Sequence, residues 1–173
     1  MPEPVRRLVL CVGNPDRGDD GVGQVVARLL RGRVPNDVVV AECDGGAAEV
    51  LDRISGVDSA ILVDAAVCGM TAGTVHRVDC AAGEAVPTAR VASSHGLGVA
   101  EAIALARTLG CLPRVCLIYA VEAKRVAPGD ELSPEVTHAA QEVAERVLLS
   151  LSGARNHDGL DMPGPSPADG FVG

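Results

Sequence analysis

The chain has 173 residues, 47% of them apolar and 22% charged, which suits one globular domain with a full core. Acidic residues outnumber basic ones by 23 to 15, and the net charge of −8 disfavours a nucleic acid or an anionic membrane as partner. One Phe, one Tyr and no Trp disfavour binding that depends on aromatic stacking on bases or flavins. No apolar run approaches about 18 residues and the N-terminus lacks a signal-peptide pattern, so we expect a cytoplasmic protein without a membrane span.

Short apolar runs alternate with helical patterns along the chain up to about residue 150. The runs predict buried strands at 8–12, 38–41, 60–63 and 115–121, and a weaker edge strand at 74–78. Apolar residues at helical spacing predict helices at 22–30, at 47–54, from Ser93 through 97–109, and from Ser133-Pro134 to 151. Residues 97–109 are apolar nearly all round, so we expect that helix to be well buried.

This alternation predicts a three-layer α/β/α sandwich with a mostly parallel five-stranded sheet. Residues 1–152 form the single predicted domain, and residues 153–173, rich in Gly and Pro, a disordered tail. The six cysteines include no C-x-x-C pair, and we expect small buried thiols kept reduced. Such sheets bind ligands beyond the carboxyl ends of the strands, where the strand order reverses.

Polar residues follow the first three predicted strands at that edge. Gly13-Asn14-Pro15-Asp16-Arg17-Gly18-Asp19-Asp20-Gly21-Val22-Gly23 follows the first strand, Asp44-Gly45-Gly46 the second, and Asp64 ends the third; Ser93-Ser94-His95-Gly96 opens the helix of 97–109. Carboxylates with one His suit a divalent cation such as zinc or nickel. The glycines at 13, 18, 21, 23, 45 and 46 would let a bulky substrate approach the backbone.

Other readings of these residues remain open. The G-x-x-x-x-G spacing of Gly13 and Gly18 resembles a phosphate loop, but Asp19 and Asp20 stand where Lys and Ser or Thr are needed. Asp19 or Asp20 could cap the helix from Gly21, Asp44 could cap the helix from Gly46, and His95 could be an ordinary hydrogen-bond partner. No acidic motif surrounds the other histidines, to which we assign no role: His76, His138 and His157.

Taken in order, these motifs resemble the nickel–iron hydrogenase maturation proteases over residues 7–150. The same match includes Gly129 and Leu132-Ser133-Pro134 before the last helix. The resemblance implies a twisted sheet flanked by helices and an endopeptidase that removes the C-terminal extension of a hydrogenase large-subunit precursor after nickel insertion. That precursor is the expected partner, and a monomer is the default oligomeric state.

The resemblance also implies the site residues. Asp20, Asp64 and His95 correspond to the metal-contacting and catalytic positions, and Asp20 stands where some relatives have Glu. The nickel would be supplied by the substrate, with no permanently bound metal in the protease. We expect substrate contacts at Gly13, Asn14, Asp44, Gly45 and Gly46. Val121-Glu122-Ala123 departs from the usual Gly-Ile-Glu-Pro, so no role follows for Glu122.

Two alternatives to this hypothesis come from different classes. One is a peptidase of the same architecture with its own metal and a different substrate. The other is a non-enzymatic, flavodoxin-like binding module, against which the acidic loop and the scarcity of aromatic residues argue.

Overall fold

The computed structural model describes residues 6–87 and 98–153, so His95 and the predicted tail beyond Gly153 lie outside the described residues. Within this part the chain forms strands and helices in the predicted alternation. The strands are β1 (Arg7–Val12), β2 (Val38–Cys43), β3 (Ser59–Ala66), β4 (Val75–Asp79) and β5 (Val115–Glu122). The helices are the short 3₁₀ helix η1 (Gly18–Gly21), α1 (Val22–Leu30), α2 (Ala47–Ile54), α3 (Gly98–Leu109) and α4 (Pro134–Gly153).

The five strands form one sheet in the order β2-β1-β3-β5-β4. β2, β1, β3 and β5 run parallel, and β4 pairs antiparallel with β5 at one edge. The predicted mostly parallel five-stranded sheet is therefore confirmed. From β1 the chain crosses to β2 on one side and returns to β3 on the other, so the strand order reverses between β1 and β3.

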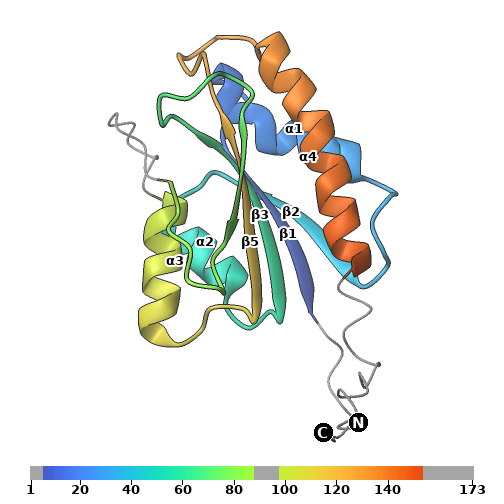
Figure 1. The fold of residues 1–173 in the computed structure, drawn as a ribbon, viewed down its shortest axis with the longest axis vertical. Coiled ribbons are helices and arrows are strands. Elements are labelled where there is room, and N and C mark those ends of the chain that lie inside the picture. The colour runs from blue at the N-terminus through green and yellow to red at the C-terminus, as the bar shows by residue number, and fades with distance from the viewer. Residues whose placement is uncertain (1–5, 88–97, 154–173) are drawn as a thin grey trace, which may run out of the picture.

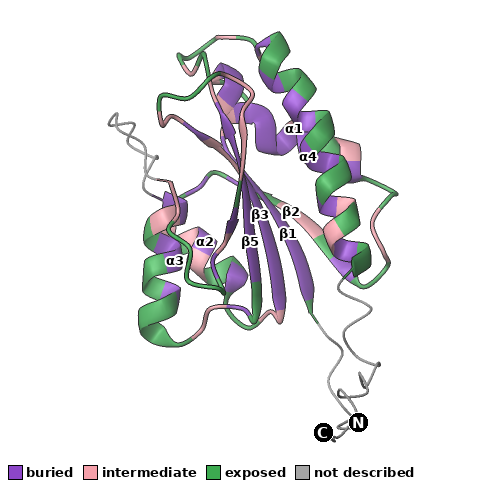
Figure 2. Ribbon diagram, in the orientation of Figure 1, coloured by how far each residue is buried: buried purple, intermediate pink, exposed green. Residues whose placement is uncertain are grey.

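Two layers of helices cover the sheet (Figure 1). α1 and α4 pack together on one face, with a core that includes Val26, Tyr119 and Val143. α2 and α3 pack together on the other, with a core that includes Leu62, Ile103 and Ile118. Successive strand residues point to opposite faces, so both cores draw on the same strands. The central strands are buried while the helices expose their outer sides (Figure 2), which is the predicted three-layer sandwich.

Two details of the predicted elements are wrong. β3 does not end at Asp64 but continues to Ala66, because Asp64, Ala65 and Ala66 remain paired with β5. Helix α3 is not well buried: Leu105 is 41% exposed and Leu109 65% exposed. α3 is an outer layer of the sandwich, so only the face toward the sheet can be covered, whatever the composition of the other side.

No carboxylate caps the two helices for which capping was considered. The residue before α1 is Gly21 and the residue before α2 is Gly46, and neither helix start carries a side-chain capping hydrogen bond. Capping by Asp19, Asp20 or Asp44 is therefore contradicted at these two helices.

The cysteines in the structure are free thiols, and the expected burial holds for four of the six. Cys68 and Cys111 are half-buried, and the buried ones are Cys11, Cys43, Cys80 and Cys116. Within residues 6–87 and 98–153, no helix has the length and apolar character needed to cross a bilayer.

Candidate functional site at the carboxyl edge of the sheet

Asp20 lies just beyond the end of β1, and Asp64 lies within the neighbouring strand β3. Both are at the point where the strand order reverses. Asp20 belongs to η1, which follows β1 and packs against β3. The pairing of β1 with β3 ends at Cys11 and Val63, so Asp64 is the first residue of β3 past that pairing. The fold thus brings together two carboxylates that are 44 positions apart in the sequence.

The carboxyl group of Asp64 has an unusually high pKa. The pKa of its carboxyl is raised to about 7. Burial is the main cause, a hydrogen bond from the backbone N–H of Ala65 partly opposes it, and the nearby negative charge of Asp20 adds a smaller rise. That N–H donates to Oδ1 over 2.8 Å. A carboxyl with this pKa is present in both protonation states near neutral pH, so it can accept a proton and release it within one reaction cycle.

Asp20 is held by its own loop. The backbone N–H of Asn14 lies 3.2 Å from Oδ2 of Asp20 and also 3.2 Å from its backbone oxygen. The N–H of Asp20 donates to the carbonyl of Arg17 over 3.2 Å. This loop therefore fixes the Asp20 carboxylate, partly exposed, beside Asp64.

Asp19, next in the chain, is fully buried and has a different environment. Its carboxylate accepts hydrogen bonds from the backbone N–H groups of Lys124 (2.7 Å), Arg125 (2.9 Å) and Ser133 (2.6 Å), and from the Ser133 hydroxyl (2.9 Å). Burial alone would raise the pKa of Asp19, but these donors bring it below its usual value. Ser133 precedes α4, so Asp19 joins η1 to the N-terminus of α4 rather than capping α1.

The chain's own atoms lie close to most glycines of these loops. A Cβ atom on Gly13 would lie 1.9 Å from the backbone oxygen of Asp20, and one on Gly98 would lie 1.7 Å from the backbone oxygen of Gly45. The chain's own atoms likewise occupy this position at Gly18, Gly21, Gly23 and Gly45, whereas Gly46 faces open space. Tight loop closure therefore accounts for glycine at five of the six positions, and the substrate contacts at Gly13 and Gly45 stay a prediction.

The other expected substrate contacts lie on the same edge. Asp44 and Gly46 are exposed, and Asn14 is half-buried in the loop that holds Asp20. Gly98, three positions after His95, packs against Gly45 in the loop after β2. His95 itself lies outside the described residues. Among the residues that are described, no three His, Cys, Asp or Glu side chains form a group that could hold a metal ion.

One pair of residues at this edge was missed. Glu122 ends β5 with 1% of its surface exposed, and its Oε2 lies 3.6 Å from Nε2 of His76 on β4. The signal was present, because an acidic residue that ends a buried strand is the pattern that singled out Asp64. His76 was read as part of an edge strand, which is confirmed, but its partner is 46 positions away and invisible to local patterning.

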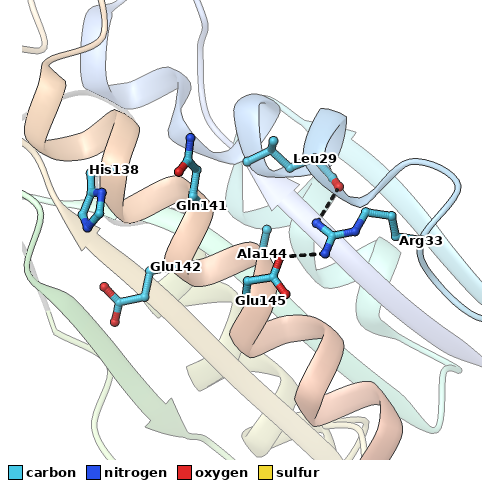
Figure 3. A pocket seen from close by; sticks show the side chains of 7 residues that line it. All are labelled: Leu29, Arg33, His138, Gln141, Glu142, Ala144 and Glu145. Atoms are coloured by element: carbon cyan, nitrogen blue, oxygen red, sulfur yellow. Dashed lines mark hydrogen bonds and ion pairs between the residues drawn. The ribbon is translucent and has the colours of Figure 1, made fainter.

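An open groove of about 440 Å³ lies elsewhere, between α1 and α4 (Figure 3). Arg33 crosses it to Glu145 over 2.6 Å. The lining residues are Leu29, Arg33, His138, Gln141, Glu142, Ala144 and Glu145. Leu29 belongs to the C-terminal end of α1, whereas the two carboxylates lie before its N-terminal end, so this groove is separate from the candidate site.

Comparisons with known proteins agree with the fold and the motifs. A sequence model of the hydrogenase maturation proteases matches residues 24–150. The hydrogenase 2 maturation protease of Escherichia coli is 30% identical over 150 residues, which cover 85% of this chain and 91% of that protein. The hydrogenase expression/formation protein HupD of Thiocapsa roseopersicina is 29% identical over 151 residues, covering 84% of this chain and 67% of HupD.

Solved structures give the same result. The hydrogenase maturating endopeptidase HybD from E. coli superimposes with a TM-score of 0.74 at 26% identity, covering 87% of this chain and 94% of HybD. A hydrogenase 2 maturation peptidase from a Thaumarchaeota archaeon superimposes with a TM-score of 0.62 at 28% identity, covering 84% of this chain and 97% of the other. The sequence match over most of the domain, the sheet order and the superposition agree, and the chain belongs to the hydrogenase maturation protease family.

Proposed function

We propose that this protein is an endopeptidase that removes the C-terminal extension of a nickel–iron hydrogenase large-subunit precursor after nickel insertion. Asp20, Asp64 and His95 contact the nickel that the precursor carries, so the metal is part of the substrate. Family membership supports the peptidase activity. The observation that carries the site assignment is the pairing of Asp20 with Asp64 at the reversal point of the sheet.

The ionisation of Asp64 supports a role in proton transfer. Peptide hydrolysis requires a base that takes a proton from the attacking water as its oxygen bonds to the carbonyl carbon. It also requires an acid that protonates the amine as the C–N bond breaks. Asp64, with a pKa of about 7, is suited to accept the first proton near neutral pH. His95 is our candidate for protonating the leaving amine.

Asp20 supports this role through its charge. Its carboxylate adds to the cost of ionising Asp64 and so helps to keep that pKa near neutrality. The same negative charge favours a bound cation, because two carboxylates that repel each other are both stabilised by a positive ion between them. Arrival of nickel-loaded precursor would therefore favour the ionised, proton-accepting form of Asp64.

The test is intact-mass analysis of a large-subunit precursor incubated with the purified chain, with and without prior nickel loading. We expect a C-terminal peptide to be lost from the nickel-loaded precursor alone. Cleavage that ignores nickel would favour a peptidase of another specificity. No cleavage of a demonstrably nickel-loaded cognate precursor would contradict the proposal.

The residue assignment needs a matched control in the same loop. Asp16 is exposed and lies four positions before Asp20. Asp20→Asn should abolish processing because it removes a charge from the site, whereas Asp16→Asn should process normally. Equal processing by both variants, or near-normal processing by His95→Ala, would remove the corresponding residue from the site.

A further inference from the structure

Glu122 binds the segment that joins β3 to β4. Its Oε1 accepts hydrogen bonds from three consecutive backbone N–H groups, those of Cys68 (2.8 Å), Gly69 (2.8 Å) and Met70 (3.1 Å). A buried carboxylate that receives three charge-assisted hydrogen bonds holds its donors firmly, because each donor would otherwise lie beside an unsatisfied buried charge.

The backbone of Glu122 holds the same segment. Its carbonyl accepts from the N–H of Gly73 and its N–H donates to the carbonyl of Thr74, both over 2.8 Å. Gly73 also packs against the first turn of α4, where an added Cβ would lie 2.8 Å from the backbone oxygen of Glu135. Both ends of the short segment from Cys68 to Thr74 are therefore attached to one residue.

His76 faces the second oxygen of the same carboxylate. Oε2 of Glu122 and Nε2 of His76 are 3.6 Å apart, and both atoms are buried with no hydrogen-bond partner among the described residues. The imidazole faces Oε2 at ion-pair distance rather than hydrogen-bond distance, and 24% of its side chain is exposed. Replacing His76 would remove this polar contact from a buried carboxylate oxygen.

The pair lies on the same side of the sheet as Asp64. Ala120 pairs with Asp64 on one side and with His76 on the other, so these three residues form one row across the sheet. Glu122 is two positions beyond Ala120 and so points to the same face. The segment Cys68–Met70 begins four positions after Asp64, at the end of the sheet where η1 lies (Figure 1). Met70 is 58% exposed there.

We propose that Glu122 and His76 are positioning residues that hold Cys68–Met70 as one wall of the site beside Asp64, with Met70 in contact with the substrate's peptide chain. This inference rests on the proposed function for the substrate, but the anchoring itself is independent of it. The pair has no direct role in bond breaking. The pair fixes the position of Cys68–Met70 through the three N–H groups bound to Oε1, and this segment in turn contacts the substrate.

The test compares Glu122→Gln, Glu122→Ala, His76→Gln and Met70→Ala with a matched control. Glu84→Gln is that control, because Glu84 also accepts a backbone N–H, that of Asp79 over 2.7 Å, but is exposed and lies at the other end of β4. We expect kcat/KM for the nickel-loaded precursor to fall about tenfold in Glu122→Gln and up to about 100-fold in Glu122→Ala. Met70→Ala should raise KM and leave kcat unchanged, and Glu84→Gln should match the wild type.

Hydrogen exchange in the unliganded chain separates anchoring from general destabilisation. The amides of Cys68, Gly69 and Met70 should exchange faster in Glu122→Gln and His76→Gln, while those of β1 keep the wild-type rate. Wild-type kcat/KM in both Glu122 variants, or faster exchange spread evenly over the sheet, overturns the inference. A wild-type chain that does not cleave the precursor contradicts the proposed function instead, and unchanged exchange at the three amides would then overturn the anchoring as well.

Discussion

Two acidic residues at the same edge of the sheet, Asp19 and Asp64, have pKa values shifted in opposite directions. Asp19 is buried among four donors, and its pKa lies below the usual value. Asp64 receives a hydrogen bond from Ala65 and lies near the negative Asp20, and its pKa is raised to about 7. Burial raises both pKa values, but four donors reverse this rise at Asp19, whereas Asp64 has one backbone donor within the described residues and the added charge of Asp20.

The comparison separates a structural carboxylate from a reactive one. The Asp19 carboxylate remains ionised and stabilises the junction between η1 and the N-terminus of α4. The Asp64 carboxyl changes protonation state near neutral pH, which a structural contact does not need and proton transfer does. Sequence proximity to a motif does not distinguish these roles, because Asp19 is closer to the centre of the glycine loop than Asp64 is.

The largest expected effect is the loss of activity in Asp64→Asn. The amide keeps the size of the side chain but cannot take a proton from water, so kcat should fall by at least about 100-fold. Thermal unfolding at pH 7 should show no loss of stability, because no favourable charge is removed. The measurement is the initial rate of precursor cleavage. Activity within tenfold of wild type would place the base elsewhere.

In contrast to Asp64→Asn, Asp19→Asn should lower the stability of the protein but leave the cleavage rate per folded molecule unchanged. The new NH₂ group would meet N–H donors in a buried place, at a cost of about 3 kcal/mol in the free energy of unfolding. Urea denaturation at pH 7 measures this cost. Because the folded pKa is lowered, the Asp19 contribution is present above the unfolded pKa and disappears as pH falls through the folded value. A constant difference between variant and wild type from pH 7 to pH 3 would contradict this account.

A third prediction tests whether the start of α3 is fixed against the loop after β2. Gly98→Ala would place a methyl group within 1.7 Å of the Gly45 oxygen, so the two segments must separate. We expect the free energy of unfolding to fall by about 2 kcal/mol. Gly46→Ala is the matched control, because nothing lies within 4 Å of its Cβ position, and it should change stability by less than about 0.5 kcal/mol. Equal effects of the two substitutions would contradict the close packing.

The pH dependence of the cleavage rate tests the proton transfer by Asp64 without a substitution. If Asp64 accepts the proton, kcat/KM should fall by about tenfold per pH unit below its pKa of about 7. Asp19 stays ionised over the same range and should contribute nothing to the profile. The measurement is the initial rate between pH 5 and pH 8 at fixed nickel loading. A flat profile across pH 7 would exclude Asp64 as the proton acceptor in the rate-determining step.

The same pKa predicts a stability change with a definite sign. The folded state holds a proton on Asp64 between about pH 4 and pH 7, whereas the unfolded chain does not. Stability should therefore fall as pH rises through this window, and Asp64→Asn should lack that part of the fall. Identical pH dependence in the two proteins would contradict a raised pKa.

The groove between α1 and α4 differs from the carboxyl edge of the sheet in the chemistry of its residues. Its polar lining includes the ion pair between Arg33 and Glu145, both substantially exposed, and such pairs contribute little energy. The carboxyl edge has the perturbed carboxyl group and the family's motifs. Chemistry rather than hollow shape identifies the candidate site.

Local patterns in the sequence were sufficient for most of the fold. Apolar runs and helical spacing depend on neighbours within a few positions, so they predicted the five strands and four α-helices near their observed places but not the 3₁₀ helix η1. The rule for parallel sheets then selected the carboxyl edge, and the family resemblance selected Asp20 and Asp64 among its acidic residues, before any contact was known. The same rule applied to β5 would have added Glu122, but its surroundings did not match the family's usual pattern.

By itself the amino-acid sequence determined the element order, the mostly parallel sheet and the edge that holds the carboxylates, because periodicity and strand ends are local properties. Only the tertiary structure decided what each acidic residue does. The donors to Asp19 come from 105 to 114 positions away, and the partner of Glu122 is on another strand. The ionisation of Asp64 depends on burial and on a charge from a different loop. Hydrogen-bond donors, burial and neighbouring charges all depend on residues that are close in space, and these residues come together only when the chain folds.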